Sequence, residues 1–143
     1  MKKNDNNSAK IIKSFLMILF IFAGICVQAQ MTEEAKIEYL INSVNTTPVG
    51  SKFIRNGTKY NTKAATDHLR TKYKSGKKYA KTAIDFIENI ASKSSMSGKE
   101  YLIEYPNGKT ITAKEFFTSI LKKLESLESL GSDVKNSNKQ VKI

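Results

Sequence analysis

His68 is the only histidine of the sequence, and its imidazole is the side chain best suited to acid–base chemistry near neutral pH. With Asp67 as the orienting carboxylate, it could serve a small hydrolase or transferase whose nucleophile is one of four serines, Ser92, Ser94, Ser95 and Ser97. Adjacent residues of a helix point about 100° apart, however, so Asp67 is poorly placed to orient His68. The competing interpretation is a hydrogen-bonded histidine at the edge of the core.

Metal and cofactor sites are not expected. One histidine and one cysteine cannot supply a histidine- or cysteine-rich metal site, and the clustered acids of a carboxylate site are absent from the sequence. Gly108-Lys109-Thr110 resembles the end of a phosphate-binding loop, but Ile103 stands where that loop requires its first glycine. The sequence therefore predicts no metal and no cofactor.

The N-terminus has the three parts of a secretory signal. Four lysines precede an apolar run at residues 15–27, and Val27-Gln28-Ala29 has the small residues that a signal peptidase reads. The run is shorter than the roughly 20 residues that span a bilayer, although an uncleaved anchor is the competing interpretation. We expect cleavage near Ala29, which would remove the lone cysteine, Cys26, and place the protein in the periplasm or outside the cell.

The positive charge is concentrated in one segment. The formal net charge is +11, and residues 52–81 contain one acid, Asp67, against ten bases: Lys52, Arg55, Lys59, Lys63, Arg70, Lys72, Lys74, Lys77, Lys78 and Lys81. Such a segment suits an anionic partner, a small anion or an envelope component, and a solubilising surface is the alternative. Nucleic acid is not expected, because the predicted export removes the protein from it and the segment lacks repeated aromatics. Membrane contact would require an uncleaved signal or this basic face.

Four helices and two turns must position these residues. Helical spacing and N-terminal caps predict helices over about 32–45, from Asn61 to just before Gly76, from Thr82 onward, and from the capping box at residues 112–115. Asn56-Gly57 and the turn at 106–109 predict short β-hairpins.

The fold class that follows is mainly α: a small single domain of about four helices with one or two short β-hairpins. The predicted domain covers residues 30–130. The segment 131–143 has too few apolar side chains to offset the entropy of ordering and is predicted to be a disordered tail.

Three segments together resemble a known family. They are FIRNG at 53–57, HLRTKY at 68–73 and the stretch from Phe86 to Leu102, which includes the serine-rich loop. Their order and spacing are similar to those of small exported bacterial proteins grouped as domain of unknown function 5329, over about residues 33–124. The resemblance implies relatives for nearly the whole domain, and it implies no activity, substrate or cofactor.

The resemblance and the serine-rich loop, whose hydroxyls, amides and lysine suit an anion, single out a candidate binding site. Its residues are Arg55, Asn56, His68, Arg70, Ser94, Ser95, Ser97 and Lys99. The leading hypothesis is a non-enzymatic extracytoplasmic binding or structural module for an anionic ligand, because an arginine fork pairs with two oxygens at once. The alternative is the serine and histidine hydrolase or transferase described above. A polar network that only fixes the loop to a helix is the structural rival of both.

Overall fold

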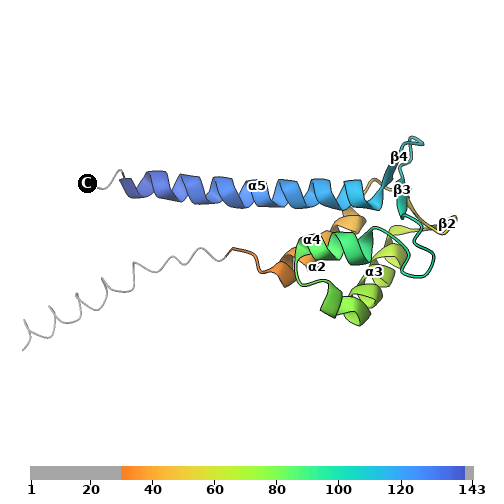
Figure 1. Cartoon of the computed structure of the whole chain (residues 1–143). Coiled ribbons are helices and arrows are strands. Elements are labelled where there is room, and N and C mark those ends of the chain that lie inside the picture. Colours follow the sequence, from red (N-terminus) through yellow and green to blue (C-terminus); the bar gives the residue numbers. More distant parts are fainter. Residues whose placement is uncertain (1–29, 141–143) are drawn as a thin grey trace, which may run out of the picture.

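The computed structural model describes residues 30–140, with the side chains of residues 30–133. The predicted signal peptide, residues 1–29, lies outside the described residues (Figure 1). Within the described range, no helix combines the length and the apolar character that a membrane crossing requires.

The helices begin where the sequence places their caps. Helix α2 is Glu33–Ser43, and the Thr32 hydroxyl accepts the Ala35 amide; a short 3-10 turn, η1, follows at Val44–Thr46. Helix α3 is Thr62–Gly76, capped by Asn61, and it ends in a second 3-10 turn, η2, at Lys77–Tyr79. Helix α4 is Ala83–Phe86, and it begins at the predicted Thr82 cap, which forms a capping box with Asp85. It continues as a π-helical segment, η3, at Ile87–Ala91.

The prediction of a mainly α fold is wrong, because the two predicted hairpins join into one sheet. Strand β1 is Lys52–Arg55, β2 is Thr58–Tyr60, β3 is Leu102–Glu104 and β4 is Thr110–Thr112. All neighbours are antiparallel in the order β2-β1-β3-β4, with Phe53 of β1 opposite Ile103 of β3. The fold is therefore mixed α/β. Pairing of β1 with β3 provides hydrogen-bond partners for the backbone at one edge of each hairpin. An isolated hairpin would be only marginally stable in water.

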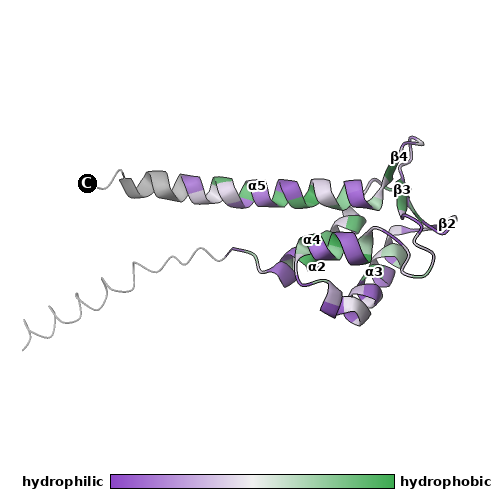
Figure 2. Ribbon diagram, viewed as in Figure 1, coloured by the Kyte–Doolittle hydropathy of each residue, from purple (hydrophilic) through white to green (hydrophobic). Residues whose placement is uncertain are grey.

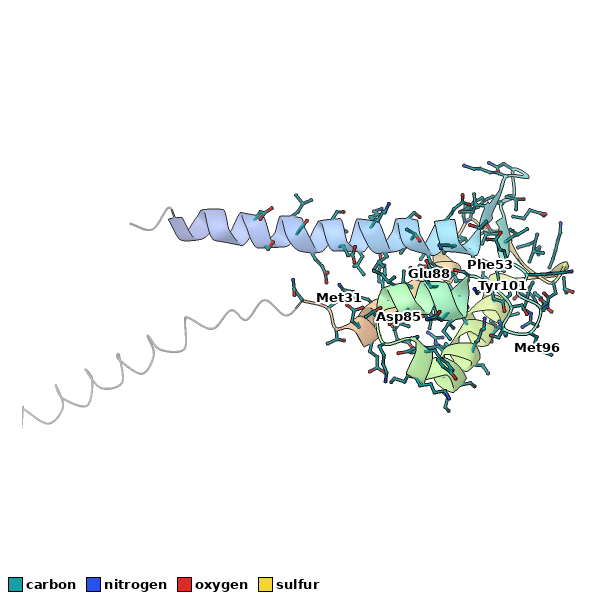
Figure 3. The ribbon with its side chains drawn as sticks, viewed as in Figure 1. Met31, Phe53, Asp85, Glu88, Met96 and Tyr101 are labelled. Carbon is teal, nitrogen blue, oxygen red and sulfur yellow. The ribbon has the colours of Figure 1, made fainter. Side chains whose placement is uncertain are left out.

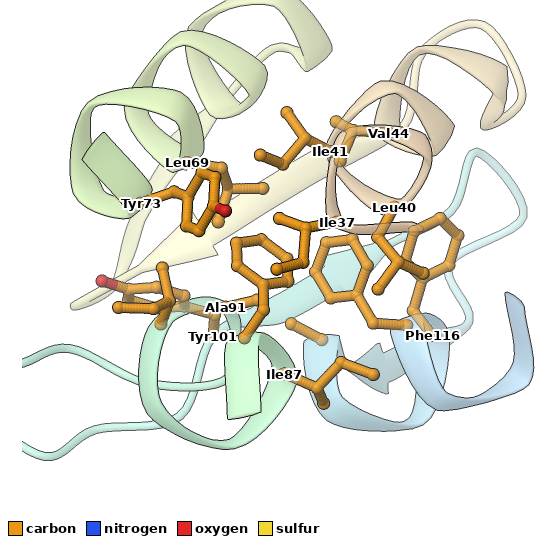
Figure 4. Close-up of a cluster of buried hydrophobic side chains, with 14 of the residues drawn as sticks. Ile37, Leu40, Ile41, Val44, Leu69, Tyr73, Ile87, Ala91, Tyr101 and Phe116 are labelled. Carbon is orange, nitrogen blue, oxygen red and sulfur yellow. The ribbon is translucent and has the colours of Figure 1, made fainter. Parts of the chain in front are cut away.

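The core lies between the sheet and the helices. Figure 1 shows the sheet at one end of the molecule, with α2, α3 and α4 lying to one side of α5. The green faces in Figure 2 turn toward this interior. The largest fully buried side chains come from α2, η1, α4, β3 and α5: Ile37, Leu40, Ile41, Val44, Phe86, Ile103 and Phe117. Figure 4 shows Ile37, Leu40, Ile41 and Val44 in one buried cluster with Leu69 and Tyr73 of α3. One continuous apolar core thus fixes the helices against the sheet.

Helix α5 is Ala113–Gln140 and is longer than predicted. Its apolar side chains Phe116, Phe117, Leu121 and Leu124 are buried, whereas Leu127 and Leu130 are 56% and 60% exposed. The backbone stays helical to Gln140, beyond the predicted domain end at residue 130, because extending an existing helix costs far less than starting one. The predicted disorder of residues 131–143 in solution stays a prediction.

Candidate functional site

The first hairpin presents Arg55 toward α3. Asn56 and Gly57 have positive φ angles of 51° and 84°, as the predicted tight hairpin turn requires. Alternation along β1 places Arg55 on the same face as Phe53, which packs edge-on against Phe116 in the core. The turn therefore holds a guanidinium group at the border between the core and solvent.

The half-buried Arg55 guanidinium meets a histidine and a tyrosine. Its Nη1 atom lies 2.7 Å from Nδ1 and 3.0 Å from Nε2 of His68, and its Nη2 atom donates to the Tyr60 hydroxyl at 3.2 Å. The guanidinium carbon also lies 5.0 Å from the centre of the Tyr60 ring, within cation–π range. These contacts orient Arg55 without neutralising its charge.

His68 is held in its neutral form. Burial lowers the pKa of His68 below its usual value, and the nearby charges of Arg55 and Lys72 lower it further. A neutral imidazole has one nitrogen free to accept a hydrogen bond from Arg55. On its other side, Nε2 lies 3.5 Å from the Tyr101 hydroxyl. His68 is thus part of a polar network, and its hydrogen-bond partners among the described residues include no serine hydroxyl.

Lys72 lies one helical turn beyond His68 and extends the network. Its ammonium group donates to the carbonyl oxygens of Ile90, at 2.6 Å, and of Lys93, and it lies 3.4 Å from the Tyr101 hydroxyl. A cation at this position satisfies carbonyl groups at the end of the π-helical segment. Burial, with the charges of Arg55 and Lys93, lowers the pKa of Lys72 to about 8.

A cavity of about 170 Å³ lies behind these polar groups. Its rim carries Arg55, Tyr60, His68 and Tyr101, and its apolar wall includes Phe53, Ala65, Leu69, Ala91, Ala113 and Phe117. Figure 4 shows Leu69, Ala91 and Tyr101 at one edge of the core cluster, and Figure 3 shows Phe53 and Tyr101 near the sheet end of the molecule. A cavity of this size accepts a ligand about as large as benzene.

The rim is positive and has no acidic counterpart. Among the residues that the structure describes, none of the side chains that line the cavity is acidic. The ion pairs found among the described residues do not include Arg55, His68 or Lys72. A partly desolvated cation without a carboxylate partner is suited to bind an anion that arrives from solution.

The serine-rich loop braces the hairpin and stays outside the cavity. The Ser97 hydroxyl donates to the Asn56 side-chain oxygen at 2.7 Å, so loop and turn are tied together. Ser94 is buried, and its backbone bonds to Lys99 and Gly98 close the loop. The cavity lining includes Arg55 and His68 but none of the predicted Asn56, Ser94, Ser95, Ser97 or Lys99.

Arg70 is separated from the other candidates by helix geometry. It lies two residues after His68 on α3, which turns its side chain by about 200° around the helix axis. Its guanidinium contacts Asn42 and lies 3.4 Å from the Glu38 carboxylate, both on α2. Of the two predicted arginines, only Arg55 reaches the cavity.

Three residues of the network were absent from the predicted site: Tyr60, Lys72 and Tyr101. Tyr60 pairs with Phe53 across the hairpin, so the predicted turn already implied that it lies beside Arg55. Lys72 follows His68 by four residues and must share its helix face. Tyr101 is the penultimate residue of the third similar segment, but its approach to α3 depends on tertiary contacts that no local pattern encodes.

The domain matches a family model described as a family of unknown function, DUF5329, over residues 31–125. The chain belongs to this family. Among curated proteins, the chain is similar to the uncharacterized protein YfeK of Salmonella typhimurium strain LT2, with 38% identity over 69 residues. That match covers 48% of this chain and 57% of YfeK. No solved structure matches.

The family match confirms the resemblance drawn from the three segments. The matched residues 31–125 contain the first hairpin, α3, the serine-rich loop and the start of α5, and hence every residue that lines the cavity. The cavity therefore lies within the family domain.

Proposed function

We propose that this family member is a binding module that takes a small carboxylate with an apolar body. The observation that carries the proposal is the half-buried Arg55 guanidinium at the mouth of an apolar cavity, with no acidic side chain lining that cavity. An arginine fork pairs with both oxygens of a carboxylate, and the apolar wall takes the rest of the ligand.

The side chains at the rim of the cavity have different roles in binding the carboxylate. Arg55 supplies the positive charge, and the Tyr60 and Tyr101 hydroxyls can donate to the same oxygens. Neutral His68 orients Arg55 and avoids a second cation in the unliganded state. The cavity volume limits the body of the ligand to about six carbon atoms, which corresponds to benzoate or a short-chain fatty acid.

We also propose that the module works outside the cytoplasm. The charged start, the apolar run at 15–27 and the small residues before Gln30 support export with cleavage near Ala29. N-terminal sequencing of the protein recovered from the periplasm and the medium tests this proposal. A protein that retains Met1 and stays in the cytoplasm would contradict it.

Calorimetric titration with benzoate tests the ligand proposal, and benzamide of nearly equal shape serves as the neutral control ligand. We expect saturable benzoate binding, at least about tenfold weaker binding of benzamide, and a similar loss in Arg55→Gln because a charge-assisted contact disappears. Arg70→Gln removes the same charge from the α2-facing side of α3 and should keep the affinity. Equal affinity for benzoate in both variants would contradict the proposal.

A further inference from the structure

The ion pairs divide the basic segment into two parts. Lys59, Lys63, Arg70 and Lys77 each contact a carboxylate: Glu104, Asp67, Glu38 and Glu34 respectively. No ion pair among the described residues includes Lys74, Lys78 or Lys81. Within the basic segment, Lys52 on β1 is also outside these ion pairs, and the other three exposed unpaired lysines lie together at the C-terminal end of α3 and in the following turn.

An open groove of about 530 Å³ lies at this place. Its cations are Lys72, Lys78 and Lys81, and its neutral polar groups include Ser75, Ser95 and Asn89. The groove is separate from the Arg55 cavity, since no residue lines both.

One acid and one aromatic ring complete the groove. Asp85 is its only acidic lining residue, and that carboxylate already accepts the Thr82 amide of the capping box at 3.0 Å. Tyr79 is 60% exposed, and the Asn89 side chain donates to its backbone carbonyl at 2.8 Å. The Lys78 ammonium lies 4.8 Å from the centre of the Tyr79 ring, so the groove offers an exposed ring beside lysines that have no carboxylate partner among the described residues.

We propose that this groove binds a stretch of acidic saccharide chain, with Lys78 and Lys81 on its carboxylate or sulfate groups. A lysine ammonium is a mobile point charge that suits oxyanions spaced along a chain. The serine and asparagine side chains offer donors and acceptors to sugar hydroxyls, and the Tyr79 ring offers an apolar surface to a sugar face. The Arg55 cavity lacks this combination, because no lysine, serine or asparagine of the described residues lines it.

Two other polyanions fit the groove less well. A bilayer surface is flat and cannot follow lysines that line a hollow, whereas an extended chain can. Single-stranded nucleic acid is held by stacking on successive aromatic side chains, and Tyr79 is the only aromatic residue that lines the groove within the described range.

The experiment is a titration of the protein at physiological ionic strength with two probes of defined length, an oligogalacturonate and a heparin-derived oligosaccharide. The test variant is Lys78→Gln with Lys81→Gln. The matched control is Lys59→Gln with Lys63→Gln, which removes the same net charge from lysines that are already paired. All four positions are exposed, so both variants should keep the thermal unfolding midpoint of the parent.

We expect at least one saccharide to bind, with an affinity about tenfold lower in the groove variant and nearly unchanged in the control. Equal losses in both variants would show diffuse attraction to net charge and overturn the proposal. Tighter binding of an oligothymidylate or of phosphatidylglycerol vesicles would show that the groove prefers another class of partner and would overturn the saccharide proposal. Absence of saccharide binding would also reject the proposal. Benzoate, which is proposed to occupy the cavity, should not displace the saccharide from the groove, so the two proposals can fail independently.

Discussion

The two cationic sites of this domain differ in how their charges are held. At the cavity, Arg55 is half-buried and fixed by His68 and Tyr60 against an apolar wall. At the groove, Lys78 and Lys81 are exposed on an open surface. The same segment of sequence therefore supplies one desolvated, oriented charge and one diffuse, solvated charge.

This difference shows that the number of basic residues in a segment does not predict which kind of anionic partner the segment binds. A partly buried charge interacts strongly over a few ångströms and is weakly screened by salt, whereas exposed charges act over longer distances and are screened. The first arrangement favours a single small anion and the second favours a polyanion.

The largest expected difference between the two sites is in stability. Phe117 forms part of the cavity wall and is 1% exposed, so Phe117→Ala should lower the free energy of unfolding by about 3–5 kcal/mol. Tyr79 borders the groove, and Tyr79→Ala should change it by no more than about 0.5 kcal/mol. Denaturant unfolding of both variants measures this, and comparable losses would show that the groove is part of the core.

Salt should separate the two binding events. A contact that releases about two counterions loses about tenfold in affinity when the salt concentration rises fourfold. We expect a loss of that order for the saccharide at the groove and a much smaller one for benzoate at the cavity, measured by parallel titrations over that salt range. Equal salt dependence at the two sites would contradict the proposed difference between a partly buried charge at the cavity and exposed charges at the groove.

Titration of Lys72 should report the charge of Arg55. The pKa of Lys72 is lowered to about 8, and Arg55 contributes to that decrease. Arg55→Gln should therefore raise the pKa of Lys72, while Arg70→Gln, on the α2-facing side of α3, should leave it nearly unchanged. The ¹³Cε chemical shift of Lys72 followed against pH gives both values, and an unchanged pKa in Arg55→Gln would break the proposed network.

The smallest expected effect is the pH dependence contributed by His68. Its pKa in the folded protein is lowered, so the unfolded chain takes up a proton first as the pH falls below about 6.5. The free energy of unfolding should therefore be unaffected by His68 titration above that pH and should decrease as the pH falls below it. His68→Gln should unfold with a flatter pH profile than the parent. Identical profiles would show that the folded environment does not disfavour the charged imidazole.

Local signals in the sequence predicted the helices, the two turns and one part of the site. The caps at Thr32, Asn61 and Thr82 are short-range features, and each has the predicted hydrogen bonds. Asn56 and Gly57 likewise determine their turn without help from the rest of the chain. Arg55 and His68, two of the predicted site residues, line one cavity, and their role in binding stays a prediction.

Long-range pairing was not predictable in the same way. The pairing of Phe53 with Ile103 joins strands far apart in the chain and creates the sheet, so the fold class was wrong although each hairpin was predicted. Arg70 was grouped with His68 because both lie in the segment at 68–73 that resembles the family, but helix geometry turns Arg70 toward α2. The serine-rich loop supports the hairpin turn through Ser97 and does not line the cavity.

The most direct test of the carboxylate proposal is an isotope-filtered NMR measurement of contacts between bound benzoate and the methyl groups of the protein. We expect nuclear Overhauser contacts from the benzoate ring protons to the methyl groups of Ala65, Leu69 and Ala91, which line the cavity. These contacts should be lost in Arg55→Gln. Contacts confined to the exposed methyl groups of Val49 or Ile84, or contacts that persist without the Arg55 charge, would contradict it.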